Sequence, residues 1–499
     1  MNMDKNSKQK HDNPVGVHCM SSGHDKKVFL ETFGCQMNIL DSELVQGQLK
    51  SAGYSFVDNA ESADVVLLNT CSVRDLSEQK VLSRLGILKA RKEAGERVVV
   101  GVLGCMAERA HDGLAQKKPF IDLMVGPSKI HDTLKLVDEA LQKTTKQPTQ
   151  KSLSNFKDRK GIKESAMLSP FDDLEALDRS RPLEARGQQW QAYVRITRGC
   201  NKFCSFCVVP RTRGPEMHRP VQSIIDEVKH LVEHGAKEVT LLGQTINHYF
   251  YEDNGRRWSF ADLLFQIHEQ VKDLPRLRFL TSYPRDFTDE ALDVMRDCDR
   301  ICKYLHIPAQ SGSDRMLRAM NRGYDVETYL GLIERAKSRM PTISLIGDMI
   351  VGFPGETEED FLLSLDLLRT VRYKNVFVFK YSPRPGTVAH RLVDDVPAEV
   401  KKARNNAMLD VQNQIALELH QDMVGKDFMV LCEGEAKIDN EALSPFVELR
   451  LNKEEQVNLM GRTGGDHIIH FRGSKAHIGS LVPVRIQEAR PLSLGAIII

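Results

Sequence analysis

No run of apolar residues in this sequence is long enough to cross a membrane. The longest purely aliphatic stretches, residues 65–68 and 98–100, are far shorter than the ~20 residues that a transmembrane helix needs. Residues 1–27 are polar and lack the apolar segment of a secretory signal. An excess of charge is also missing, because 69 Lys and Arg oppose 68 Asp and Glu and leave a net charge of +1. These absences favour a cytoplasmic protein with no membrane partner and no globally basic surface.

Several common catalytic motifs are missing as well. The sequence contains no Walker A loop, no G-x-G-x-x-G, no H-E-x-x-H and no G-x-S-x-G, so nucleotide hydrolysis, Rossmann redox chemistry and serine catalysis have no support. What is present is a chain of 499 residues, 41% of them hydrophobic, which is enough for about three domains. Ten cysteines are also present. In a reducing compartment, cysteines grouped by spacing indicate metal ligands or reactive thiols rather than disulfides.

Residues 27–142 are expected to form a doubly wound α/β domain. Short apolar runs at 28–32, 65–68, 98–103 and 121–125 are each followed by a helix-like stretch, which is typical of buried parallel strands and their crossover helices.

Cysteines follow the first three of these strands at equivalent places. They are Cys35, Cys71 and Cys105. Because ligand sites of open parallel sheets lie beyond the carboxyl ends of the strands, the three are expected to converge there. The alternative is that they are three buried structural cysteines.

Residues 143–189 are polar and without periodicity, and we expect a linker. Residues 190–420 then alternate strand and helix again, and a partial barrel of six strand-helix units, (βα)6, is expected, fewer than the eight of a closed TIM barrel. The strand candidates are residues 193–197, 238–242, 277–281, 304–307, 343–351 and 375–381.

Residues 421–490 are expected to form a small all-β barrel of the OB type, because short strands follow one another without helices between them. Tails are expected at 1–26 and 491–499. The strand candidates of this module are residues 427–432, 446–451, 456–460, 467–471 and 481–487.

The strongest local signal is a C-x3-C-x2-C run formed by Cys200, Cys204 and Cys207. Thiolates select iron-sulfur clusters, zinc or copper. A zinc site would require a fourth protein ligand, and none with finger-like spacing follows. A cluster held by three protein ligands would leave one iron open to a small molecule. The remaining four cysteines, Cys19, Cys298, Cys302 and Cys432, belong to no motif.

This run resembles the signature of radical S-adenosylmethionine enzymes, and the wider sequence resembles the methylthiotransferases among them. The resemblance covers about residues 27–488. It includes the surroundings of the three amino-terminal cysteines and residues 199–214, 241–244, 306–313, 350–356 and 381–387. The carboxyl-terminal module is similar to the TRAM domain, an RNA-binding barrel, most clearly at residues 461–463 and 467–471.

The resemblance implies two 4Fe-4S clusters facing one cavity. Cys200, Cys204 and Cys207 would hold the radical cluster, and Cys35, Cys71 and Cys105 an auxiliary cluster through which sulfur is delivered. One S-adenosylmethionine would give the 5′-deoxyadenosyl radical and a second would supply the methyl group. Gln244, Ser282 and Gln310 stand at or just beyond strand ends, where they could contact S-adenosylmethionine or belong to solvated loops.

Within the family, the chain is most similar to the enzymes that add a methylthio group to carbon 2 of N6-isopentenyl-adenosine beside the anticodon of tRNA. Rival substrates are a ribosomal-protein aspartate and threonylcarbamoyl-adenosine in tRNA. A non-catalytic iron-sulfur RNA-binding protein is a further alternative. The implied partners are tRNA, an unidentified reductant and an unidentified sulfur donor, with the chain acting as a monomer.

Residues 195–219 carry a concentration of positive charge, with six basic residues and one acid, Glu216. We expect contact with RNA phosphates there, and the alternative is a solvated rim. The basic residues are Arg195, Arg198, Lys202, Arg211, Arg213 and Arg219. If RNA docks on the last module, we expect its later strands to carry the contact, and the alternative is a structural barrel docked on the catalytic domain. The basic residues of these strands are Arg462, Arg472, Lys475, Arg485 and Arg490.

Overall fold

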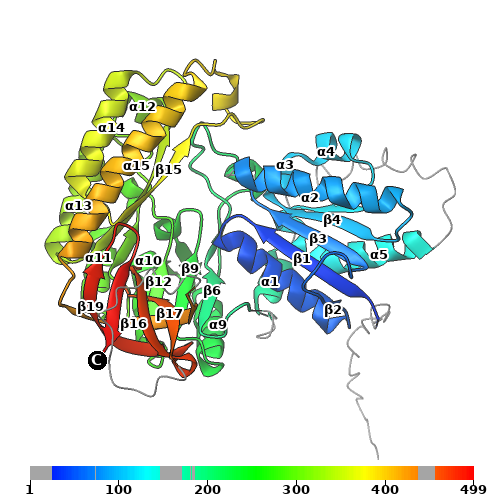
Figure 1. The fold of residues 1–499 in the computed structure, drawn as a ribbon, viewed down its shortest axis with the longest axis horizontal. Coiled ribbons are helices and arrows are strands. Elements are labelled where there is room, and N and C mark those ends of the chain that lie inside the picture. The colour runs from blue at the N-terminus through cyan, green and yellow to red at the C-terminus, as the bar shows by residue number, and fades with distance from the viewer. Residues whose placement is uncertain (1–24, 73–74, 146–170, 180, 182–185, 437–455) are drawn as a thin grey trace, which may run out of the picture.

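The computed structural model of the chain describes residues 25–72, 75–145, 171–179, 181, 186–436 and 456–499. An amino-terminal α/β unit lies beside a larger unit of strands and helices, and a small barrel packs on the larger unit (Figure 1). Within the described part of the chain, no helix has the length and hydropathy needed to cross a membrane.

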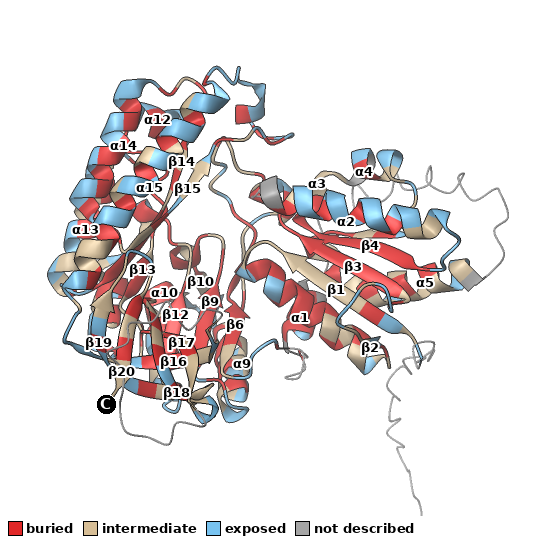
Figure 2. Ribbon diagram, in the orientation of Figure 1, coloured by how far each residue is buried: buried red, intermediate tan, exposed pale blue. Residues whose placement is uncertain are grey.

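The amino-terminal unit is the expected doubly wound sheet, with all strands parallel in the order β2-β1-β3-β4-β5. Its central strands β3 and β4 are buried along their whole length because helices cover both faces (Figure 2). The strands are β1 (Lys27–Phe33), β2 (Ser55–Phe56), β3 (Val65–Thr70), β4 (Val99–Gly104) and β5 (Leu123–Val125). The helices are α1 (Gln36–Ser51), α2 (Asp75–Glu93), α3 (Cys105–Arg109), α4 (His111–Lys117) and α5 (Thr133–Thr145).

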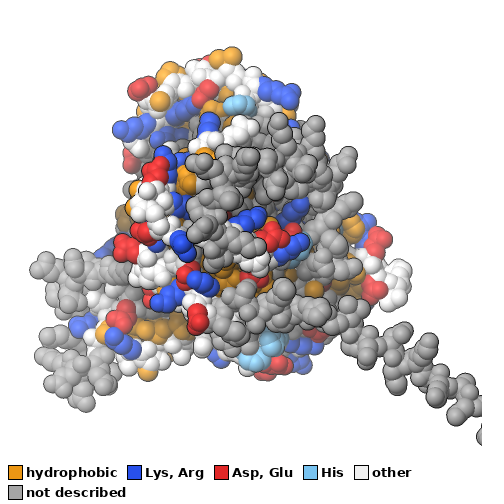
Figure 3. Space-filling model, turned by 90° about the vertical axis from the view of Figure 1, so that its right-hand side faces the viewer, with side chains coloured by type: hydrophobic (Ala, Val, Ile, Leu, Met, Phe, Trp, Pro, Cys, Tyr) orange, Lys and Arg blue, Asp and Glu red, His pale blue; other side chains and the backbone are white. Residues whose placement is uncertain are grey.

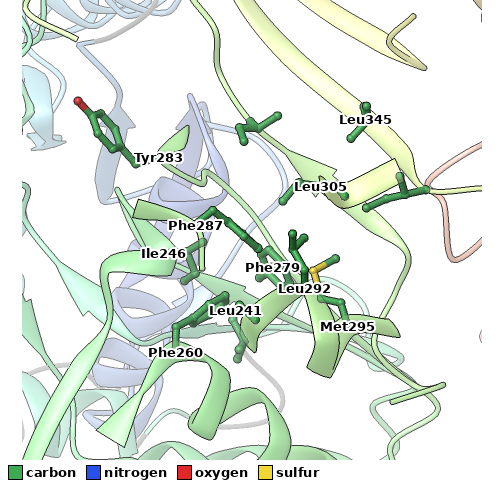
Figure 4. Packing of buried hydrophobic residues seen from close by; sticks show 14 of the residues in the cluster. Leu241, Ile246, Phe260, Phe279, Tyr283, Phe287, Leu292, Met295, Leu305 and Leu345 are labelled. Carbon is green, nitrogen blue, oxygen red and sulfur yellow. The ribbon is translucent and has the colours of Figure 1, made fainter. Parts of the chain in front are cut away.

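The central unit contains the six predicted parallel strands as two three-stranded halves, β12-β9-β6 and β13-β14-β15. A bridge between Leu277 and Ile301 joins the halves into one partial barrel. Figure 4 shows Phe279, Phe287 and Leu292 packed together in its core. The strands are β6 (Gln191–Arg195), β9 (Glu238–Leu242), β12 (Arg276–Phe279), β13 (Tyr304–His306), β14 (Ser344–Val351) and β15 (Asn375–Lys380).

Helices cover the outside of this barrel because each presents one apolar face to the strands, as Ile224, Ile225 and Val228 do in α9. The helices are α8 (Val209–Thr212), α9 (Val221–Glu233), α10 (Phe260–Gln270), α11 (Asp289–Asp297), α12 (Asp314–Ala319), α13 (Val326–Arg339), α14 (Glu358–Val371) and α15 (Ala398–Gln421). Two small hairpins pair β7 (Thr197–Arg198) with β8 (Met217–His218), and β10 (Phe250–Asp253) with β11 (Arg256–Ser259).

The predicted linker, residues 143–189, contains the helix α7 (Phe171–Arg179). Its Leu174 and Leu177 are buried in the core of the amino-terminal unit. Its Glu175 and Asp178 are also buried. This stretch therefore connects the units by packing rather than by polar chain alone. A helix of nine residues between polar segments is too short to stand out by its periodicity.

The carboxyl-terminal strands close into a barrel in the order β16-β17-β18-β20-β19. The expected tail at 491–499 is wrong, because β20 (Leu494–Ile498) lies between β18 and β19 and buries Leu494. The strand expected at 446–451 lies outside the described residues. The other strands are β16 (Asp427–Glu435), β17 (Gln456–Arg462), β18 (Ile468–Ser474) and β19 (Leu481–Ala489).

This barrel docks on the amino-terminal ends of the central strands. Arg276 at the start of β12 donates to the carbonyl oxygens of Arg462 at 2.8 Å and Met429 at 2.6 Å. Ser344 at the start of β14 is 3.1 Å from Nε2 of His467. Burial lowers the pKa of His467 to about 3, so its imidazole is neutral in this contact.

The basic stretch 195–219 forms a buried ion-pair network instead of an RNA-facing surface. Arg195 bonds Asp41 of α1 at 2.9 Å and Asp178 of α7 at 2.6 Å. Arg213 bonds the other oxygen of Asp41 at 2.9 Å. Arg198 also pairs with Asp178 at 2.5 Å, and burial beside Arg195 lowers the pKa of Arg198 to about 10.

The predicted phosphate contact is therefore wrong for the buried arginines, because their guanidinium groups form ion pairs with carboxylates inside the protein. Arg219 is fully buried and bonds Glu175 at 2.6 Å and Glu227 at 2.7 Å. Lys202 pairs with Asp286, and Arg211 is the exposed member of the set. On the face in Figure 3, basic and acidic side chains of the described residues are interspersed rather than separated by sign.

Removing Asp178 should destabilise the fold strongly, because the buried Arg198 would lose its carboxylate partner and the buried Arg195 would lose one of its two. Asp178→Ala is expected to lower the free energy of unfolding by about 3 kcal/mol. The measurement is chemical denaturation followed by circular dichroism. Asp366→Ala is the control, because it removes a 68% exposed ion-pair partner of Arg369. It should change the free energy of unfolding by less than about 0.5 kcal/mol. Equal effects of the two substitutions would contradict the network's role.

Candidate active site

The C-x3-C-x2-C loop begins directly after β7 and is held by backbone contacts. Gly199, which precedes Cys200, has φ +68°, and a Cβ there would lie 2.0 Å from the carbonyl oxygen of Pro215. Only glycine fits this turn. The amide of Ser205 donates to the carbonyl of Met320 at 2.9 Å, which fixes the middle of the loop beside the end of α12.

The three loop cysteines interact electrostatically with one another. Burial, reinforced by Cys204 and Cys200, raises the pKa of Cys207 to about 12, and burial also raises the pKa of Cys200. The guanidinium of Arg322 donates to Sγ of Cys204 at 3.2 Å. Three cysteines within eight residues, on a loop held by backbone contacts, form a donor set that suits an iron-sulfur cluster.

The amino-terminal cysteines meet at the edge where the strand order reverses between β1 and β3. Cys35 caps α1, Cys71 follows β3, and Cys105 is the first residue of α3. A hydrogen bond from Cys71, together with nearby Arg213, lowers the pKa of Cys35 to about 6. Burial raises the pKa of Cys105, which lies within electrostatic reach of Cys35. This donor set also suits a cluster at the topological switch point.

Two buried asparagines support this crevice and were not singled out in the sequence. Asn38 donates to Oδ1 of Asn69 at 3.2 Å, and Asn69 donates back to the carbonyl of Asn38 at 2.9 Å. The sulfur of Cys35 lies 3.3 Å from Oδ1 of Asn38. A Cβ at Gly34 would lie 2.5 Å from Cβ of Cys71. An asparagine at the end of a buried strand was the available sequence signal.

A cavity of about 450 Å³ opens between the three units. Cys35 and Cys71 line it from the amino-terminal unit, and Gly243 and Gln244 line it from the end of β9. The other predicted cluster ligands do not line it; they are Cys105, Cys200, Cys204 and Cys207. Beside these cysteines the contact between the amino-terminal unit and the central unit is apolar, because Met37 and Leu40 of α1 pack on Leu242. The structure does not show one cavity lined by both triads, because the amino-terminal triad reaches this cavity through Cys35 and Cys71 and the radical triad does not line it.

The three side chains predicted for S-adenosylmethionine have different surroundings. Gln244 lines the cavity. Ser282 is 3% exposed, and its hydroxyl has no hydrogen-bond partner among the described residues, which suits a ligand contact. Gln310 has φ +76° and joins β14 through its backbone, accepting from the amide of Ile350 at 2.9 Å. Ser282 and Gln310 do not line the cavity.

The interior of the cavity is polar, which the sequence interpretation missed. Nε2 of His306 lies 3.3 Å from Oδ1 of Asp348. Nη2 of Arg278 lies 3.2 Å from Oε2 of Glu238. From the carboxyl-terminal barrel, Glu433, Arg462 and Asp466 complete the floor. Polar residues inside otherwise apolar strands, at alternating positions such as Glu238 and Thr240, were the signal of an inward-facing polar row.

Comparisons with known proteins agree with this geometry. Residues 194–368 match the radical SAM superfamily, and residues 27–126 match uncharacterized protein family UPF0004. The tRNA-2-methylthio-N(6)-dimethylallyladenosine synthase of Rhodopirellula baltica is 41% identical over 465 residues, 93% of each chain. The synthase of Aquifex aeolicus is 38% identical and is matched over 94% of this chain and 98% of its own.

Among solved structures, the radical S-adenosylmethionine methyltransferase TsrM of Kitasatospora setae, with tryptophan and a cofactor analogue bound, has a TM-score of 0.52. It is 16% identical and matches 86% of this chain and 81% of its own, which shows the fold alone.

The partial barrel and its cysteine loop define a radical S-adenosylmethionine enzyme. Sequence identity of about 40% to the synthases, along nearly the whole chain, assigns a narrower family than the fold and the cysteine loop do. This chain belongs to the family of the tRNA-2-methylthio-N6-dimethylallyladenosine synthases.

Two glycine substitutions test the packing of the amino-terminal crevice. Gly104 and Gly95 have φ of +86° and +91°, so alanine costs about 1 kcal/mol at either position. A Cβ at 104 would also lie 2.4 Å from Oδ1 of Asn69, whereas nothing lies within 4 Å at 95. Gly104→Ala should therefore lower the free energy of unfolding by about 1–3 kcal/mol more than Gly95→Ala, measured by denaturant titration. Indistinguishable variants would refute the close packing.

Proposed function

We propose that this protein adds a methylthio group to carbon 2 of N6-dimethylallyl-adenosine, the same base as N6-isopentenyl-adenosine, in tRNA. The observation that carries the proposal is the placement of two cysteine triads on facing units, with Arg213 of the central unit beside Cys35 and Cys105. A radical site and a sulfur site must act on one base carbon, so they have to be held in a fixed relation.

Each triad would hold one 4Fe-4S cluster. Cys200, Cys204 and Cys207 would hold the radical cluster, and with three protein ligands one iron would remain for S-adenosylmethionine. The cluster would supply the electron for cleavage of the cofactor. The chain's own part is positioning and exclusion of water. Arg322 orients Cys204 through its bond to the sulfur, and the carbonyl of Pro308 holds the same guanidinium at 3.0 Å.

S-adenosylmethionine would lie at the ends of the central strands. Ser282 offers a buried hydroxyl without a protein partner there, and Gln244 offers an amide at the cavity wall. Gln310 would contribute through the conformation of its backbone, since its backbone N–H donates to the backbone carbonyl of Asp348 at 2.8 Å.

The carboxyl-terminal barrel would contact tRNA as well as form the cavity floor. Most of its basic residues are already paired: Lys475 with Glu435, Arg485 with Asp427, and Arg490 with Glu488. Arg462 faces the cavity and Arg472 is exposed. RNA contact by this barrel would therefore centre on Arg472 and on backbone groups rather than on a broad basic face.

Two cysteine variants test the assignment of the clusters. After anaerobic reconstitution, the unchanged chain should hold about eight irons, and Cys200→Ala and Cys71→Ala about four each. Cys71→Ala should still form 5′-deoxyadenosine from S-adenosylmethionine with a reductant, whereas Cys200→Ala should form none. Iron analysis and chromatography measure the two properties.

Cys298→Ala is the matched control, because this buried cysteine belongs to neither triad. It should retain about eight irons. About eight irons in Cys71→Ala would contradict the auxiliary site. Failure of the unchanged chain to form 5′-deoxyadenosine would favour a non-catalytic iron-sulfur protein instead.

A further inference from the structure

A second cavity, of about 400 Å³, lies behind the amino-terminal cysteine triad. Glu108, Pro127 and Ser128 line it from the amino-terminal unit and Leu174 from α7. The central unit contributes the segment that follows the cysteine loop, including Thr212. None of the six predicted cluster cysteines lines this cavity, and it shares no lining residue with the first.

The walls of this cavity are cationic. Four arginines line it, and the acid among its lining residues is Glu108. The arginines are Arg195, Arg198, Arg211 and Arg213. Three of them share the two carboxylates of Asp41 and Asp178, so the lining residues and their ion-pair partners retain one positive charge in excess.

Donors in this wall are left without acceptors. Arg195 is 1% exposed and Arg198 is 7% exposed, and Nε of each is buried with no hydrogen-bond partner among the described residues. A buried guanidinium N–H without an acceptor costs free energy, which an anion would offset. Arg211 is exposed at the rim and forms no ion pair within the described ranges.

The cavity adjoins the sulfur site. Thr212 lies beside the thiol of Cys105, and the guanidinium of Arg213 lies beside both Cys105 and Cys35. Thr212 and Arg213 line the second cavity, whereas Cys35 and Cys71 line the first. The triad is therefore flanked by two separate spaces, one on the side of the central strand ends and one behind it.

We infer that the second cavity binds thiosulfate, a small sulfur-bearing anion, as the source of the sulfur consumed in each turnover. Two electrons from the reductant that the radical reaction already requires, with one proton, would break its S–S bond, so that hydrosulfide is formed for the triad and sulfite leaves. This inference rests on the proposed function, in which every product gains one sulfur atom. An anion bound here lies beside Thr212 and Arg213 and does not occupy the first cavity, where the base would bind. The volume admits a small ion with its water, and the guanidinium groups select negative charge.

Thiosulfate is the probe that tests the inference. Isothermal titration of the anaerobically reconstituted full chain should show saturable binding of one equivalent. Arg211→Gln and Arg198→Lys should each weaken the affinity about tenfold or more, because each removes a charge-assisted hydrogen bond. Arg211→Gln alters an exposed side chain, so it retains the fold even if Arg198→Lys does not. Arg472→Gln, an exposed arginine on β18, is the control and should bind as the unchanged chain does.

Absence of saturable thiosulfate binding, or equal thiosulfate affinity of the Arg211→Gln chain and the unchanged chain, would overturn the inference. So would displacement of thiosulfate by an anticodon stem-loop whose own binding depends on Arg211, which would assign the cavity to an RNA phosphate. Methylthio product without thiosulfate binding would refute only the cavity assignment, whereas thiosulfate binding by a chain that makes no product would refute only the proposed function.

Discussion

The active-site arrangement depends on two buried carboxylates that are shared by arginines from another unit. Asp41 of α1 binds Arg195 and Arg213, and Asp178 of α7 binds Arg195 and Arg198. All of these side chains are nearly inaccessible, so each charge requires its partner. The ion pairs fix the amino-terminal sheet against the barrel in one orientation. That orientation sets the relation between the two cysteine triads.

The same network gives the loop after the radical cysteines a second role. Arg213 stands six residues beyond Cys207 and reaches the crevice that contains Cys35 and Cys105. A single short segment therefore contacts both predicted cluster sites. On the opposite side of the barrel, Arg276 and Arg278 bind backbone carbonyls of the carboxyl-terminal barrel, which closes the base of the first cavity. Three units thus enclose the first cavity.

Much of the fold follows from the sequence, because buried parallel strands form nearly continuous apolar runs. The run at 238–242 coincides with β9, and the other central strands begin and end within two residues of their predicted bounds. The convergence of Cys35, Cys71 and Cys105 also follows, since strand topology brings the ends of β1, β3 and β4 to one edge.

What the sequence does not show is which charges are buried. In the sequence, Arg195 and Arg219 belong to a basic stretch that predicts a charged surface, but in the structure they pair with Asp178 and Glu175 of α7. That helix is too short to be recognised by its periodicity. The strand β20 was missed although residues 494–499 form a short apolar run rich in isoleucine, because its place in the barrel depends on pairing with β18 and β19. The polar floor of the first cavity likewise depends on contacts between units.

The central claim is that the two triads act together on a dimethylallylated adenosine. The most direct measurement is mass spectrometry of anticodon stem-loops that carry either adenosine or N6-dimethylallyl-adenosine, after anaerobic incubation with the reconstituted chain, a reductant and S-adenosylmethionine labelled in its methyl group. The account predicts a labelled methylthio group on the dimethylallylated base and none on plain adenosine. An unchanged dimethylallylated base, in a reaction that still produces 5′-deoxyadenosine, would contradict it.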